Sequence, residues 1–92
     1  MKKVSAWSNY FAGDFYCRKL LPINDKSICE ISSVYFGNIP LYAYWFYQLE
    51  SESWLKLGQN ENLYRCIIAS DIFLINKGYY IEKPFIIEDK YG

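Results

Sequence analysis

Short apolar runs alternate with polar turns along the chain, and the spacing inside each run predicts the element that it forms. Four apolar residues in the segment 3–20 recur at the three- and four-residue steps of one helix face: Val4, Trp7, Phe11 and Phe15. We therefore expect an amphipathic helix over 3–20 that ends before Pro22. A pair of short strands is the alternative for this segment, because Gly13 weakens a helix.

The segments 27–36 and 41–49 are rich in β-branched and aromatic residues, which favour strands. In a strand over 41–49, Trp45 and Tyr47 share the drier side with two leucines, so we expect that side to meet the core. A helix is the alternative for 41–49, because a proline precedes the segment and a glycine could end it.

The other side of the 41–49 strand is the candidate partner-binding surface. It carries Tyr42, Tyr44 and Phe46, and the polar turn that follows adds Glu50, Glu52 and Trp54. Aromatic residues are over-represented at binding hot spots, and a polar rim usually surrounds the centre of an interface. We therefore expect these six residues to contact a partner. In the alternative interpretation, the aromatic run and Trp54 belong to the core.

The end of the chain contains two apolar runs, 72–75 and 79–81, joined by a short segment with Gly78 in its last position. This pattern predicts a β-hairpin with a three-residue loop. A helix over 62–76 that ends at Gly78 is the alternative. We prefer the hairpin because the helix would place Asp71 among apolar residues.

These elements together predict a small α+β domain that spans 1–92. Its antiparallel sheet has about four to six strands, with one N-terminal helix packed on it. The composition supports a packed core, because 52% of the 92 residues are hydrophobic and 21% are aromatic. Three cysteines without a CxxC pair, Cys17, Cys29 and Cys66, are expected to be reduced and buried.

The residue types and motifs of the chain give little support to an enzymatic function. The chain contains 0 histidines, so the commonest general base and a leading metal ligand are missing. The glycines are scattered and form no phosphate-binding loop, and the carboxylates are not clustered as a calcium site requires. We expect a non-enzymatic protein without catalytic residues, metal or cofactor.

Charge and hydropathy limit the remaining partners. The formal net charge is zero, from 10 basic and 10 acidic residues, which makes nucleic acid an improbable partner. The longest apolar run, 41–47, is far too short to span a membrane, and no signal-peptide pattern is present. We expect a protein of the cytoplasm of a bacterial host that is a monomer or a small homo-oligomer.

In size, composition and lack of motifs, the chain is similar to the small proteins of phages and mobile elements. Many of those proteins are stoichiometric inhibitors, such as anti-CRISPR and antirestriction proteins, or immunity proteins that neutralise toxins. The resemblance implies a protein-binding module that blocks a surface of a target protein. The alternatives are an accessory protein of an assembly that associates with itself, and a nucleic-acid-binding module.

Overall fold

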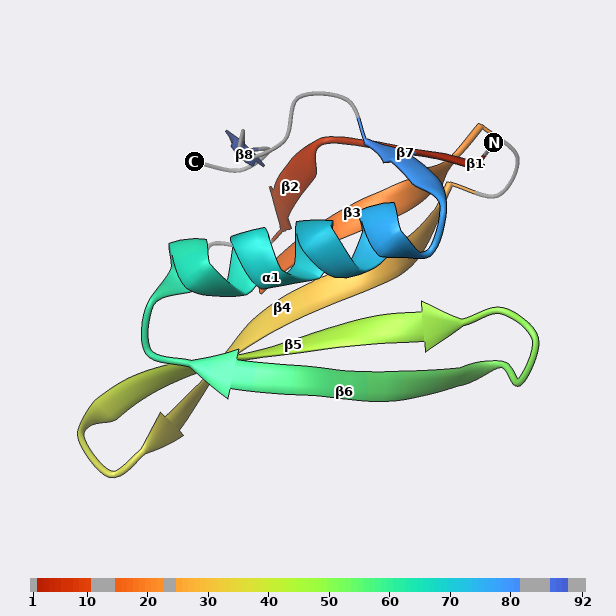
Figure 1. Cartoon of the computed structure of the whole chain (residues 1–92). Coiled ribbons are helices and arrows are strands. Elements are labelled where there is room, and N and C mark those ends of the chain that lie inside the picture. Colours follow the sequence, from red (N-terminus) through yellow and green to blue (C-terminus); the bar gives the residue numbers. More distant parts are fainter. Residues whose placement is uncertain (1, 11–14, 23–24, 82–86, 90–92) are drawn as a thin grey trace.

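The computed structural model describes residues 2–10, 15–22, 25–81 and 87–89. Its elements, labelled in Figure 1, follow one another as β1 (Lys2–Val4), β2 (Trp7–Tyr10), β3 (Phe15–Leu21), β4 (Lys26–Phe36), β5 (Ile39–Gln48), β6 (Ser53–Asn60), α1 (Leu63–Asn76), β7 (Tyr79–Ile81) and β8 (Ile87–Asp89). The α+β class is confirmed. The number and direction of the strands and the position of the helix differ from the expectation.

The eight described strands form one curled, mixed sheet. Its main path has the order β6-β5-β4-β3-β1-β7, and β2 and β8 lie off this path. Neighbours from β6 to β1 are antiparallel. β1 and β2 both pair with β3. β7 pairs in parallel with β1, and β8 pairs in parallel with β2. The expectation of a purely antiparallel sheet is therefore wrong at this edge, because α1 lies between β6 and β7 and carries the chain back across the sheet.

The expected N-terminal helix over 3–20 is wrong, and the alternative of short strands is right. Val4 and Trp7 are both fully buried although they are three residues apart. A continuous strand would turn them to opposite sides. The break between β1 and β2 resets the alternation, so a spacing that resembles a helix arises from two strands. Phe11 lies outside the described residues.

α1 forms where the sequence predicted a hairpin, so the hairpin over 72–81 is wrong and the alternative helix is right. The side chain of Asn62 caps its N-terminus by accepting hydrogen bonds from the backbone N–H groups of Tyr64 at 2.9 Å and Arg65 at 3.4 Å. The helix ends before Gly78, whose φ of 92° lies in the left-handed region and whose N–H donates to the carbonyl of Ile75.

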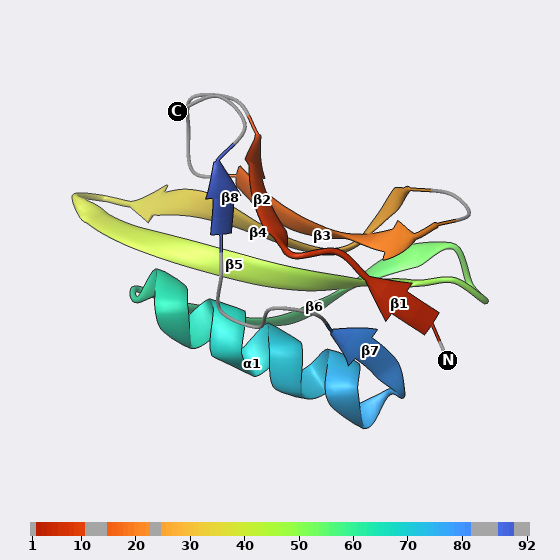
Figure 2. The same cartoon turned by 90° about the horizontal axis from the view of Figure 1, so that it is seen from above.

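Figure 2 shows α1 lying along one face of the sheet. The core lies between helix and sheet, and its fully buried side chains include Trp7, Ile31, Ile67 and Leu74. The expected strand over 41–49 is confirmed as β5, in the centre of two hairpins with β4 and β6. In the part of the chain that the structure describes, no helix has the length and apolar character needed to cross a membrane.

Candidate functional site

The aromatic side of β5 that was expected to face a partner faces α1 instead. Phe46 is only 6% exposed, and its ring centroid lies 4.9 Å from that of Phe73 in α1. Tyr42 and Tyr44 are half-buried and pack against the core. The expectation that this side of β5 is the more exposed to solvent is therefore wrong, because α1 covers it.

The turn between β5 and β6 keeps its polar residues in solvent. Glu50 and Glu52 are exposed, and Trp54 at the start of β6 is 39% exposed. Trp54 pairs with Tyr47, and the two ring centroids are 5.1 Å apart. Phe46 and Tyr47 are neighbours in β5, so Trp54 lies on the side of the sheet opposite Phe46. The structure thus divides the six predicted residues between two surfaces, and their contact with a partner stays a prediction.

An exposed apolar surface lies on α1. We name it the α1 stripe, and it consists of Tyr64, Ile68, Ile72 and Ile75, which are 63%, 42%, 54% and 55% exposed. Their steps of four, four and three residues place them on one side of the helix. The opposite side of α1 is also apolar and buries Cys66, Ile67 and Leu74. A helix that is apolar on both sides is normally buried on both sides, by its own domain or by a partner.

Few charges interrupt the α1 stripe. Between Leu63 and Asn76 the sequence contains two acidic or basic residues, Arg65 and Asp71. Arg65 is exposed beside the stripe, whereas Asp71 is buried. The four half-exposed side chains leave on the order of 400 Å² of apolar surface in water. A patch of this size is within the range of the largest apolar patch on an ordinary monomer, and such patches are often functional.

A buried polar cluster fixes the rotation of α1 about its axis. Arg18 of β3 donates from Nε to Oδ1 of Asp71 at 2.8 Å and from Nη2 to Oδ2 at 2.9 Å. The indole N–H of Trp7 donates to Oδ1 of Asp71 at 3.0 Å, and Nη1 of Arg18 donates to the backbone carbonyl of Ser5 at 2.6 Å. These bonds tie α1 to β2 and β3 on the side of Asp71 and so determine which side chains face outward.

Compared with known proteins, the chain matches no known protein family, no curated protein and no solved structure. A function for the chain is therefore inferred from its own surfaces and side chains.

The three cysteines Cys17, Cys29 and Cys66 are completely buried, as the sequence predicted. Burial raises the pKa of the Cys29 thiol to about 12, and it also raises the pKa of Cys66. At neutral pH both groups are therefore protonated thiols, which are poor nucleophiles. Their environment is that of core residues. Among the described residues, no three histidine, cysteine or carboxylate side chains cluster as metal ligands.

Proposed function

We propose that the chain is a non-enzymatic protein-binding module, and that it acts as a stoichiometric inhibitor or immunity-type protein by covering a surface of its target. The observation that carries this proposal is the α1 stripe, a row of half-exposed Tyr and Ile side chains on a helix whose other side already fills the core. Burying such a row against a partner is favourable by about 25 cal/mol for each Å² removed from water.

The chemistry of the α1 stripe suits a protein partner. A helix that rests on an anionic membrane usually presents several basic residues beside its apolar side, and a nucleic-acid-binding surface presents a basic patch. Within α1 the stripe has one cationic neighbour, Arg65, and the chain has zero net charge. Tyr64 and Arg65 are of the residue types that are enriched at hot spots of protein interfaces.

The contacts that hold α1 on the sheet also favour binding. The ion pair between Arg18 and Asp71 and the packing of Phe73 on Phe46 hold the helix in place before any partner arrives. A helix held in this way loses little conformational freedom on binding, so more of the burial energy remains as affinity. A rigid surface of this kind supports an inhibitor that works by occupying its target. Its expected place of action is the cytoplasm of a bacterial host.

Self-association is the second candidate function, and β6 supports it. β6 lies at the edge of the described sheet and pairs there with β5 alone. It carries Trp54 and Leu55, which are 39% and 40% exposed. An edge strand without proline can pair with the same strand of a second copy. Sedimentation over a range of concentrations distinguishes the candidates, because an inhibitor of this type stays small and an assembly protein grows with concentration.

The experiment that tests the main proposal is affinity capture from a bacterial host lysate with matched variants. The test variant carries Ile68→Glu and Ile72→Glu in the α1 stripe. The control carries Val34→Glu and Ile39→Glu, two similarly exposed residues near the turn between β4 and β5. Both variants change two apolar side chains to carboxylates, so their net charges are equal.

We expect the wild-type chain and the control to capture the same protein, and the α1 stripe variant to retain less than about a tenth of it. Circular dichroism and thermal melting of each variant verify that it is folded. A folded α1 stripe variant that captures its target as well as the wild-type chain does would refute the proposal.

A further inference from the structure

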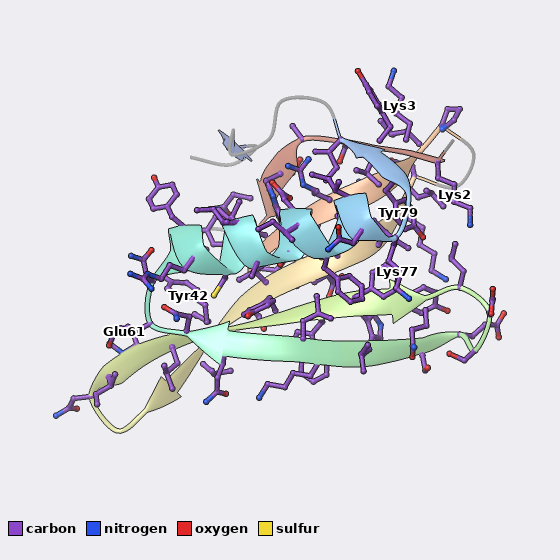
Figure 3. The ribbon with its side chains drawn as sticks, viewed as in Figure 1. Lys2, Lys3, Tyr42, Glu61, Lys77 and Tyr79 are labelled. Atoms are coloured by element: carbon purple, nitrogen blue, oxygen red, sulfur yellow. The ribbon has the colours of Figure 1, made fainter. Side chains whose placement is uncertain are left out.

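A second candidate site lies at the C-terminal end of α1. A groove of about 640 Å³ separates the turn between β5 and β6 from the end of the helix and the start of β7. The residues that matter for its chemistry are Lys2, Phe46, Gln48, Glu50, Lys77 and Tyr79. Figure 3 shows Lys2, Lys77 and Tyr79 together at this end of the helix, far from Tyr42 at the other end. The groove shares no residue with the α1 stripe.

The floor of the groove is aromatic. The ring centroids of Phe46 and Tyr79 are 6.1 Å apart, and the rings are inclined by 73°. Phe46 also packs against Phe73 of α1 and belongs to the core, so the floor of the groove is supported by the core. A supported apolar floor next to a few polar groups is the usual composition of a binding groove, and the volume lies within the range of ligand sites.

Two ammonium groups flank this floor. Nζ of Lys2 lies 5.8 Å from the ring centroid of Tyr79, and Nζ of Lys77 lies 5.6 Å from that of Phe73. Both lysines are exposed, and in the described part of the chain neither forms an ion pair. An ammonium group close to the limit of about 6 Å for a cation–π interaction still has its three N–H donors available for an anion. Among the described residues of the lining, Glu50 is the one carboxylate beside the two lysines, so these residues carry a net positive charge.

We propose that this groove binds an acidic segment of a polypeptide, with an apolar side chain against the half-buried ring of Tyr79, beside Phe46, and its carboxylates at Lys2 and Lys77. Charge complementarity supports an acidic occupant, because two unpaired cations face one carboxylate. The half-buried Tyr79 ring and the volume favour a peptide over a bare inorganic anion, which would contact the ammonium groups and leave Tyr79 uncovered. The proposal does not depend on the α1 stripe.

The test uses nuclear magnetic resonance of the ¹⁵N-labelled full chain with three probes. The first is the peptide acetyl-Asp-Glu-Phe-Asp-Glu-amide. The second is its uncharged counterpart acetyl-Asn-Gln-Phe-Asn-Gln-amide, and the third is inorganic phosphate. We expect saturable shifts of the amides of Gln48, Gly78 and Tyr79 with the acidic peptide, and at least about fivefold weaker binding of the other two probes.

Three variants complete the test. Lys77→Gln should weaken binding of the acidic peptide at least about fivefold, whereas Glu50→Gln should strengthen it, because it removes the opposing charge. Lys56→Gln in β6 removes one exposed cation that does not line the groove, and it should leave the affinity within about twofold of wild type. All three side chains are exposed, and amide resonances that match the wild-type spectrum verify the fold.

Several results would overturn the proposal. One is the absence of shifts in the groove, and another is equal binding of the acidic and uncharged peptides. Phosphate binding as tight as that of the acidic peptide would show a site for small anions only. Equal losses in Lys77→Gln and Lys56→Gln would show an effect of overall charge rather than a site.

Discussion

Arg18 and Asp71 form a bidentate ion pair in the interior of the protein, where their side chains are 0% and 2% exposed. Arg18 belongs to β3 and Asp71 to α1, so the pair joins the sheet to the helix. Asp71 was the reason to prefer a hairpin over a helix in the sequence analysis. A carboxylate among apolar residues is costly when it is alone, but Arg18 and the indole of Trp7 satisfy it here.

Removing one partner of this pair should destabilise the fold strongly. Asp71→Ala leaves the guanidinium of Arg18 buried without its counter-ion, and we expect the free energy of unfolding to fall by about 3–5 kcal/mol. Replacing both residues, as Arg18→Met with Asp71→Leu, should cost less than Asp71→Ala alone. Urea denaturation followed by tryptophan fluorescence measures all three proteins.

The exposed pair of Lys19 and Asp25 provides the control, with 3.4 Å between Nζ and Oδ2. Asp25→Asn should change the free energy of unfolding by less than about 1 kcal/mol. If Asp71→Ala proved as mild as Asp25→Asn, the buried pair would not be what holds α1 on the sheet.

Gly58 and Tyr44 are packed too closely for a larger residue. A Cβ atom at Gly58 would lie 2.6 Å from Oη and 2.9 Å from Cζ of Tyr44. We expect Gly58→Ala to lower the free energy of unfolding by about 1–3 kcal/mol, because the ring must move out of its place on the core. In a Tyr44→Leu background the same substitution should cost much less. Equal costs in both backgrounds would mean that the tyrosine ring is not the obstacle.

The buried thiol of Cys29 predicts how stability changes at alkaline pH. Its pKa is raised from 9.0 to about 12 by burial, so the folded protein keeps this proton at pH values where the unfolded chain loses it. The resulting stability is complete below pH 9 and is lost as the pH rises towards 12, at about 1.4 kcal/mol per pH unit. Tyr79 and Cys66, whose pKa values are also raised by burial, act in the same direction.

Urea denaturation at pH 8.5 and pH 10.5 measures this effect. Because Cys29→Ala removes the titrating group, its free energy of unfolding should fall less between the two pH values than that of the wild-type protein. Parallel losses in both proteins would show that Cys29 does not contribute.

The strands with regular alternation could be predicted from the sequence, and the elements that depend on distant partners could not. β4 and β5 follow from dense β-branched and aromatic residues. α1 was the less favoured alternative because the partner of Asp71 is 53 positions away, at Arg18. Val4 and Trp7 mimic a helix because the break between β1 and β2 shifts the alternation. The spacing of residues within these segments indicates neither the distant partner of Asp71 nor the break between β1 and β2.

The side of β5 that faces α1 was missed for the same reason, while contact of the six predicted residues with a partner stays a prediction. The alternation that separates Phe46 from Tyr47 was identified correctly, but the side that α1 covers cannot be chosen until the helix is known. Once 62–76 is taken as a helix, its spacing reveals both the buried side and the α1 stripe. The exposed positions of Glu50 and Glu52 were predictable, since polar turn residues rarely lie in a core.

Oxidative footprinting of the complex with a captured target tests the role of the α1 stripe most directly. Hydroxyl radicals modify exposed side chains, and mass spectrometry compares the rate at each residue in the free and bound chain. We expect at least about fivefold protection of Tyr64 and Ile72, with Trp54 modified at the same rate in both states. Protection of Trp54 and its turn with no change at Tyr64 and Ile72 would contradict this proposal and place the interface on the opposite side of the molecule.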